Sequence, residues 1–341
     1  MKKTKNIFGQ IIAVENLAQA AAKAMRGKNS KAIKSFAKNS PERLSELHDS
    51  LLAGNYKPAG YKEMIITDLK RRVIKIAPFY PDRIMHHAIM NIVEPIISKT
   101  FIHHTYACIK NKGGHRCIAD LYKDMRANYS DTTYCLKFDV RKFYDSVDHQ
   151  VLKSIIRRKI ADEKALTLID SIIDSTDAGI PIGNYTSQHF SNLYLAYFDH
   201  YCKEDLKLKF YYRYMDDIVV LAGSKQELQS AFKAIETYLK QRLKLEIKAN
   251  WQIFPVDKRQ IDFCGYKVNH HGIMLRKKIL YNLYKKFSSL NQPVSDLAQL
   301  KHKMPSHYGW LLHTDEKHFT HITNHLIIKQ NAKINKKLIC A

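Results

Sequence analysis

Three aspartates stand in two segments of the chain whose patterns predict β-strands. Apolar and polar side chains alternate along residues 134–140, which predicts a strand that carries Asp139 near its end. Residues 210–221 form two β-prone arms on either side of Asp216 and Asp217, so this pair is expected at the tip of a tight hairpin. Three converging carboxylates repel one another unless cations lie between them. Such a cluster suits two Mg²⁺ ions that hold a phosphoryl group during an in-line displacement.

The simpler interpretation is that the acidic pair only forms a polar turn, since two adjacent aspartates are a weak signal when they stand alone. Two observations favour a catalytic role for the pair over a simple polar turn. The arms beside the pair are unusually apolar, and Asp139 ends an upstream strand in a similar setting. The period of two also puts Lys137 and Asp139 on one face of that strand, opposite Leu136.

The elements that must hold these carboxylates belong to a basic, core-forming chain. It has 341 residues, 56 Lys and Arg against 32 Asp and Glu, a formal charge of +24 and 45% hydrophobic residues. The length predicts two or three packed subdomains, and the hydrophobic content excludes a disordered polybasic tail. The charge indicates a polyanionic partner, with nucleic acid the first choice and an anionic membrane the second.

The membrane option is disfavoured because no segment approaches the roughly 20 apolar residues that cross a bilayer. The six cysteines form no CxxC pair, which argues against a zinc site and indicates free thiols in a reducing cytoplasm.

Hydrophobic spacing predicts the remaining elements. Leu44, Leu47 and Leu51 are expected to form the buried stripe of a helix that begins at Pro41. Further helices are expected over residues 16–25, 149–173 and 226–243. Two more are expected to begin at residue 82, continuing past Pro95, and at about residue 187, and most of the last sixty residues are also expected to be helical. The remaining expected elements are a hairpin over residues 64–76 and short strands up to residue 268.

The run Tyr214-Met215-Asp216-Asp217 resembles the YxDD signature of reverse transcriptases. Asp139, with Tyr144 five residues later, resembles the first catalytic strand of that family. The resemblance implies an RNA-directed DNA polymerase of class α+β. It implies a right-hand polymerase fold with an antiparallel-sheet palm, basic fingers and a short helical thumb.

The resemblance also implies a division of the chain. The N-terminal helices and fingers would take residues 1–130, and the palm 131–148 and 177–272. A helical insertion near the fingers would take 149–176, and the thumb 273–341. No appended RNase H, endonuclease or maturase domain is expected.

The family's functional residues map onto this chain by motif. Asp139, Asp216 and Asp217 would be catalytic and, with the carbonyl of Val140, would hold two Mg²⁺ ions. Tyr144 would pack under the sugar and exclude a 2′-hydroxyl, although an ordinary core aromatic is the alternative. The other residues expected at the nucleotide are Arg72, Lys75, Lys110, Ile182, Gln188 and Lys248. Those expected to form the primer grip are Cys264, Gly265 and Tyr266.

Residues 179–188 look like the GxxxSQ motif of the reverse transcriptases of diversity-generating retroelements, and group II intron and retron relatives usually have Gln where this chain has Ile182. The branch is known for misincorporation opposite template adenines. Ile offers no hydrogen bond, and a lost hydrogen bond is worth roughly 0.5–1.5 kcal/mol, so discrimination between base pairs is expected to fall. Simple packing of Ile182 in its loop is the competing interpretation.

The partners implied by this resemblance are a template RNA, an RNA–cDNA hybrid, dNTPs and a small basic accessory protein, in the cytoplasm of a bacterium or encoded by a phage. A retron-like or phage-defence reverse transcriptase with the same chemistry is the nearest alternative function. A non-catalytic RNA-binding scaffold is disfavoured, because a scaffold has no need of mutually repelling carboxylates.

Overall fold

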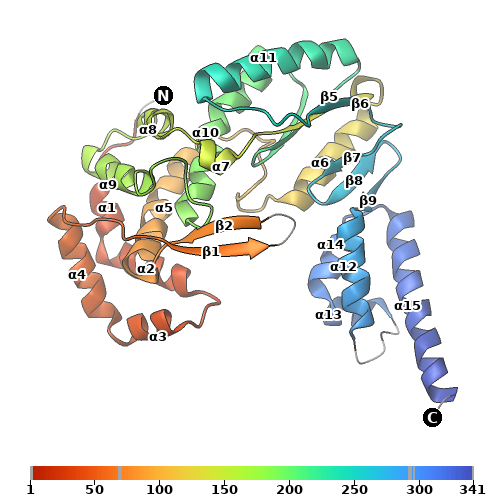
Figure 1. Cartoon of the computed structure of the whole chain (residues 1–341), viewed down its shortest axis with the longest axis horizontal. Coiled ribbons are helices and arrows are strands. Elements are labelled where there is room, and N and C mark those ends of the chain that lie inside the picture. Colours follow the sequence, from red (N-terminus) through yellow and green to blue (C-terminus); the bar gives the residue numbers. More distant parts are fainter. Residues whose placement is uncertain (1–2, 68–70, 291–293, 295, 340–341) are drawn as a thin grey trace. The chain divides into compact units, whose positions relative to one another are not determined.

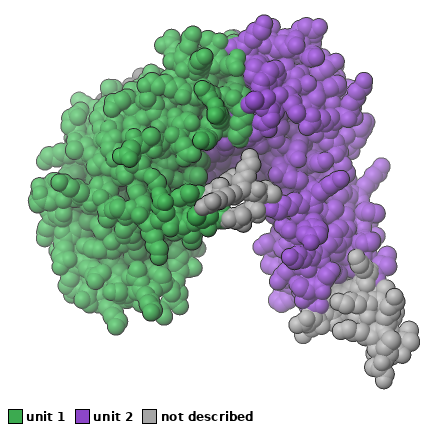
Figure 2. Space-filling model, viewed as in Figure 1, with its two compact units in different colours: residues 1–103, 140–206, 234–248 green, residues 104–139, 207–233, 249–341 purple. Residues whose placement is uncertain are grey.

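The computed structural model describes residues 3–67, 71–290, 294 and 296–339 (Figure 1). The chain forms two compact units, each built from three separate segments (Figure 2). Unit 1 contains residues 1–103, 140–206 and 234–248, and unit 2 contains residues 104–139, 207–233 and 249–341. These units group the chain differently from the boundaries expected for fingers, palm and thumb, which therefore stay a prediction.

Unit 1 is mainly helical and carries one two-stranded hairpin. Residues Leu44, Leu47 and Leu51 are all buried, as their spacing predicts. The helix that contains Pro95 runs past this residue as expected, but Pro95 does not interrupt it. The elements are α1 (Phe8–Ile12), α2 (Val14–Met25), α3 (Lys31–Lys38), α4 (Ser40–Leu52), β1 (Lys62–Thr67), β2 (Arg71–Ile76), α5 (Ile84–Ile97), α7 (Phe143–Ser146), α8 (His149–Arg157), α9 (Glu163–Ile173) and α10 (Tyr185–His200).

The helix expected over 149–173 is interrupted, so this prediction is wrong in one detail. Asp162 caps the second helix by accepting a hydrogen bond from the Ala165 amide at 3.2 Å. The same carboxylate accepts bonds from the amides of Ile7 at 2.7 Å and Phe8 at 2.9 Å. Asp162 therefore satisfies backbone donors of α9 and of the N-terminal segment together, and a continuous helix would forfeit these bonds.

Unit 2 contains two antiparallel sheets and the C-terminal helices. The larger sheet has the strand order β4-β5-β3-β6, and the smaller has the order β7-β8-β9. The elements are α6 (Gly114–Ala127), β3 (Tyr134–Asp139), β4 (Phe210–Tyr214), β5 (Asp217–Ala222), β6 (Gln252–Pro255), β7 (Ile261–Phe263), β8 (Tyr266–Asn269), β9 (Gly272–Leu275), α12 (Lys277–Ser288), α13 (Leu297–Lys303), α14 (Pro305–Leu311) and α15 (Glu316–Ile339). Helix α11 (Lys225–Leu243) begins in unit 2 and ends in unit 1.

The two faces of the larger sheet differ in what covers them. Cys135 of β3 belongs to a buried cluster with Cys117 and Leu121 of α6, so α6 packs on this face. Phe138 points to the other face, where its ring lies 6.4 Å from Phe232 of α11. The alternation read from the sequence is therefore the alternation of the folded strand, and the class is α+β.

The described thiols and helices give two further facts. The five described cysteines, Cys108, Cys117, Cys135, Cys202 and Cys264, form no disulfide bond with one another. Among the helices of the described ranges, none has the length and hydrophobicity needed to cross a membrane.

The turn between β7 and β8 fixes the hairpin against the C-terminal helices. Its two residues, Cys264 and Gly265, have φ values of 46° and 87°, and a type I′ turn needs positive φ at both positions. A Cβ atom at Gly265 would lie 2.7 Å from side-chain atoms of both Ile279 and Trp310. The turn can therefore approach α12 and α14 this closely only with glycine.

Gly265→Ala is expected to lower the free energy of unfolding by roughly 2–5 kcal/mol, because it adds a clash to an unfavourable φ. Urea unfolding followed by circular dichroism measures this loss. Gly9→Ala is the matched control, since a Cβ at Gly9 meets nothing within 4 Å and φ is not positive there. Equal unfolding midpoints for the two variants would contradict the assigned packing of the turn.

Candidate active site

The strand register brings together the carboxylates of two neighbouring strands. Asp139 ends β3 and is the cross-strand partner of Asp217, the first residue of β5. Asp216 directly precedes Asp217 in the turn of the β4–β5 hairpin. All three predicted catalytic side chains therefore belong to one end of one sheet, and all three lie in unit 2.

The acidic hairpin closes through a two-residue turn. Tyr214 pairs with Asp217, which leaves Met215 and Asp216 as the turn residues. Met215 has a φ of 57°, a value that the first position of a primed hairpin turn requires and that is costly for a side chain of this size. The fully buried Arg213 donates a hydrogen bond of 3.1 Å from its guanidinium to the carbonyl oxygen of Met215.

Arg213 thus stabilises an unfavourable turn conformation from within the core. Sequence reasoning did not assign it a role. The available signal was a single arginine among the aromatic residues of an otherwise apolar arm.

Lys137 is a second site residue that sequence reasoning placed on the correct face but left without a role. Its Nζ lies 3.4 Å from Oδ2 of Asp217, and it donates a hydrogen bond to the main-chain carbonyl of Asp262. The side chains of Lys137 and Asp217 are 22% and 25% exposed, so water screens this ion pair only in part.

The electrostatics of the site show the repulsion that the sequence predicts. Burial is the main cause that raises the pKa of Asp217 to about 7; the nearby charges of Asp139 and Asp216 act in the same direction, and Lys137 opposes them. Oδ1 of Asp217 is buried and has no hydrogen-bond partner. A buried, unpartnered carboxylate oxygen beside two other carboxylates is a suitable ligand for a divalent cation.

No preformed cage surrounds that oxygen. Within the part of the chain that the structure describes, no group of three or more His, Cys, Asp or Glu side chains is already arranged to hold a metal ion. Mg²⁺ usually binds through one or two carboxylates, and substrate phosphates and water supply the remaining ligands. The donor set therefore fits Mg²⁺ held jointly by protein and substrate.

The residues expected to form the primer grip lie at the β7–β8 turn, also in unit 2. Cys264 is partly exposed, and Gly265 is enclosed by the packing described above. Tyr266 is fully buried, and its hydroxyl lies 2.6 Å from Nδ1 of His115 and donates to the carbonyl oxygen of Trp310 at 3.2 Å. The side chain of Tyr266 therefore holds the hairpin to His115 of α6 and to Trp310 of α14 from within the core. Lys110, the remaining predicted residue of unit 2, is exposed.

Unit 1 brings together the residues expected around Ile182. A Cβ atom at Gly183 would collide with the carbonyl oxygen of Lys75, so the loop over 180–184 lies directly against β2. Ile182 is 36% exposed, and Lys75 is half-buried. Arg72 pairs with Ile66 in the β1–β2 ladder, and its side chain lies outside the described part of the protein.

The same loop contacts the predicted sugar-selecting residue. The carbonyl oxygen of Tyr144 in α7 accepts a hydrogen bond of 2.9 Å from the amide of Ile180, and the side chain of Tyr144 is half-buried. Half-buried Gln188 lies in the first turn of α10, which begins at Tyr185.

Val140 and Lys248 lie on adjacent segments of unit 1. Val140 forms an isolated antiparallel bridge with Ile247, and half-buried Lys248 follows Ile247 in the chain. Lys248, one of the residues expected at the nucleotide, therefore lies beside the segment that continues from Asp139.

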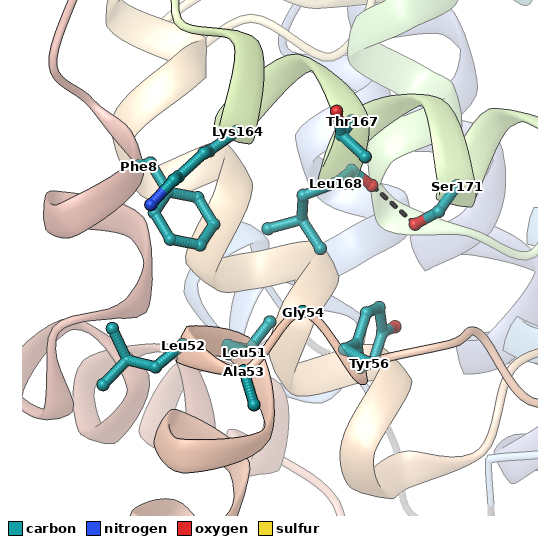
Figure 3. Close-up of a pocket in the computed structure, with 10 residues that line it drawn as sticks. All are labelled: Phe8, Leu51, Leu52, Ala53, Gly54, Tyr56, Lys164, Thr167, Leu168 and Ser171. Atoms are coloured by element: carbon teal, nitrogen blue, oxygen red, sulfur yellow. Dashed lines mark hydrogen bonds between the residues drawn. The ribbon is translucent and has the colours of Figure 1, made fainter.

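A pocket of about 270 Å³ lies elsewhere in unit 1, and Figure 3 shows its walls. Leu51 and Leu168 provide apolar surface, while the Ser171 hydroxyl donates to the carbonyl oxygen of Leu168 at 2.8 Å. The lining residues are Phe8, Leu51, Leu52, Ala53, Gly54, Tyr56, Lys164, Thr167, Leu168 and Ser171. None of them is a predicted site residue, so this pocket is separate from the acidic hairpin.

Asp217→Asn is expected to stabilise the metal-free protein at pH 8. A carboxyl whose pKa is raised in the folded state favours the protonated form, so the fold loses stability as the pH rises through about 7. The neutral amide avoids this loss, and the free energy of unfolding in EDTA should increase by roughly 1–3 kcal/mol at pH 8. The gain should be smaller at pH 5, where the native aspartate is protonated.

Urea titrations at the two pH values measure the effect. The control is Asp205→Asn at an exposed position of unit 1, which should change stability by less than about 0.5 kcal/mol. An Asp217→Asn protein no more stable than the native protein at pH 8 would show that Asp217 is not under electrostatic strain.

Comparison with known proteins agrees with this geometry. The family described as reverse transcriptase (RNA-dependent DNA polymerase) matches residues 56–268. Protein YkfC of Escherichia coli K12 is 24% identical over 295 residues, which cover 73% of this chain and 75% of YkfC. The group II intron-encoded protein LtrA of Lactococcus lactis subsp. cremoris is 25% identical over 184 residues, which cover 50% of this chain but only 30% of LtrA.

A solved structure supports the architecture. Apo telomerase from Candida tropicalis superposes with a TM-score of 0.51 at 13% identity, over 82% of this chain and 59% of the telomerase chain. This likeness confirms the expected right-hand polymerase fold of class α+β. The matched region covers more than half of the chain and includes both strands that bear the carboxylates, so the chain belongs to the reverse transcriptase family.

Proposed function

We propose that this reverse transcriptase copies a template RNA into error-prone cDNA, with errors at template adenines, as part of a diversity-generating retroelement. The observation that carries the chemistry is the register that sets Asp139 opposite Asp217, beside Asp216. The choice of branch rests on the GxxxSQ motif over 179–188 and on Ile182 within it.

Asp139 and Asp216, with the carbonyl of Val140, would hold two Mg²⁺ ions, and Asp217 would support them from the hairpin. When bound, Mg²⁺ would lower the pKa of the primer 3′-hydroxyl and neutralise charge on the departing pyrophosphate. The chain's own contribution is to keep the carboxylates close before any substrate arrives. The partly buried setting of Asp217 and its unpartnered oxygen support this role.

The incoming nucleotide would be bound largely by residues of unit 1. Arg72, Lys75 and Lys110 are proposed to contact the triphosphate, in falling order of priority, with Lys248 as a further cation. Tyr144 would exclude a 2′-hydroxyl by steric contact. The hydrogen bond that its main-chain carbonyl accepts from the Ile180 amide supports this role, because it fixes the backbone from which the ring extends.

The nucleic acid would be a hybrid of template RNA and growing cDNA. A net charge of +24 favours binding to phosphates with little sequence preference and a steep dependence on salt. The β7–β8 turn, with Cys264 at its exposed point, would act as the primer grip. A small basic accessory protein and a cytoplasmic location are proposed on the resemblance alone.

Ile182 is proposed to lower fidelity at the nascent base pair. Its 36% exposure supports contact with substrate over simple packing in the loop, since a packing residue would be buried. An apolar side chain there offers neither donor nor acceptor, so correct and incorrect pairs differ less in free energy.

A second candidate is an intron-associated reverse transcriptase, which the similarity to LtrA favours. The chemistry at the acidic hairpin would be the same. The two candidates differ in the cDNA they make, because adenine-directed errors are expected only for the first.

Asp216→Ala is expected to reduce primer extension on an RNA template by at least about 100-fold. The variant loses a ligand of the Mg²⁺ ions that would stabilise the charge of the transition state. Extension with Mg²⁺ and dNTPs is measured in single-turnover reactions. Asp205→Ala, which removes an exposed aspartate, should retain native activity. An Asp216→Ala protein that extends primers at the native rate would refute the assignment.

Ile182→Gln is expected to reduce the frequency of errors at template adenines by up to about tenfold, since one regained hydrogen bond approaches 1.4 kcal/mol. Deep sequencing of cDNA made on an adenine-rich template measures this frequency. Ile182→Leu restores no hydrogen bond and should keep the native error spectrum. An unchanged adenine error frequency in Ile182→Gln would remove Ile182 from the fidelity mechanism.

A further inference from the structure

Lys137 occupies a defined place beside the acidic hairpin. It lies on β3 two residues before Asp139, and its cross-strand partners are Val219 on β5 and Gln252 on β6. The period of two directs its side chain to the same face of the sheet as Asp139. The amine therefore extends from the middle of the sheet along the face that carries the carboxylates.

Two of the three donors of this amine have partners. One partner is Oδ2 of Asp217, at 3.4 Å, and the other is the main-chain carbonyl of Asp262 on β7. Nζ also lies over the ring of Phe263, 5.8 Å from the ring centroid. A side chain tied at both sites and only 22% exposed has little freedom to leave this position.

The ion pair with Lys137 gives the two carboxylate oxygens of Asp217 different surroundings. Lys137 engages Oδ2, whereas Oδ1 is buried without a partner. A carboxylate held through one oxygen cannot rotate freely about its side-chain bonds. The free oxygen is therefore presented in a fixed direction.

The second contact connects the sheet to the hairpin expected to grip the primer. Asp262 accepts the bond from Lys137 through its main chain, and its carboxylate accepts a bond of 2.6 Å from Nε of Arg276. The amide of Arg276 donates to the carbonyl oxygen of Gly265 at 3.0 Å. A continuous set of polar contacts thus runs from Asp217 to the β7–β8 turn, entirely within unit 2.

We infer that Lys137 is a positioning residue for phosphoryl transfer: it orients Asp217 and couples the acidic hairpin to the β7–β8 turn. The inference rests on the proposed polymerase function, because it assigns a role within that reaction. Lys137 need not touch the substrate to act in this way. An isosteric, uncharged side chain in its place would leave the packing unchanged and release Asp217.

The kinetic test compares Lys137→Met with Lys137→Arg. Loss of a charge-assisted hydrogen bond predicts that Lys137→Met lowers kcat for primer extension roughly 10- to 100-fold. KM for dNTP should change less than about threefold, because the nucleotide contacts are elsewhere. Lys137→Arg restores a cation that can reach both acceptors and should recover most of kcat.

Lys209→Met is the matched control, since it also removes a lysine of unit 2 that is ion-paired with an aspartate, Asp131, at 3.6 Å. It should keep native kcat, because that pair is on the surface. The inference is overturned if Lys137→Met keeps native kcat, or if Lys137→Arg is as slow as Lys137→Met.

A second measurement is independent of catalysis. In EDTA, Lys137→Met and Asp217→Asn are combined in a double-mutant cycle of urea unfolding. Lys137→Met should lower the unfolding midpoint of the native protein and lower it less than half as much in the Asp217→Asn background. Additive shifts would overturn the inferred contact. Because no substrate is present, this cycle separates failure of the inference from failure of the proposed function.

Discussion

Mutual repulsion among three carboxylates is the constraint on which the arrangement of unit 2 depends. Asp139, Asp216 and Asp217 lie at one end of one sheet, and burial makes the negative charge of Asp217 costly enough to move its pKa to about 7. The fold offsets this cost only in part, through Lys137, and leaves one oxygen of Asp217 without a partner. A sheet under selection for stability alone would replace such a residue, so its presence is best explained by a cation that completes the site.

The register of the strands determines whether Asp139 and Asp217 meet, so the arrangement of the carboxylates depends on the packing of the whole sheet. Strand β3 has buried side chains on both faces, with Cys135 packed toward α6 and Phe138 toward α11. A slip of β3 by one residue would exchange the two faces and turn Lys137 and Asp139 together away from the face that carries Asp217. The hydrophobic packing of the sheet therefore keeps Asp139 and Asp217 paired at one end of the sheet.

The elements that sequence reasoning predicted correctly are those whose signal is local. Alternation identifies β3 and the acidic hairpin, and helical spacing identifies the buried leucines of α4. The predictions that failed or were missing depend on partners distant in sequence. The break before α9 requires Asp162 to meet the N-terminal segment, and Lys137 acquires its role only when β7 lies beside it. A motif also locates a residue without orienting it, so the burial of the Tyr266 side chain could not be read from the primer-grip resemblance.

The loop that carries Ile182 is anchored on both sides of this residue by backbone contacts, and the buried side chain of Asn184 adds a hydrogen bond of 2.8 Å to the hydroxyl of Tyr61. The amide of Ile180 donates to the carbonyl of Tyr144, and Gly183 lies against the carbonyl of Lys75. Between these two fixed points the side chain of Ile182 remains 36% exposed. A substitution at this position can therefore change the exposed side chain of the loop without moving the attachments of the loop to α7 and β2. Under the role proposed for Ile182, a change of this one side chain would alter fidelity while the backbone of the loop stays the same.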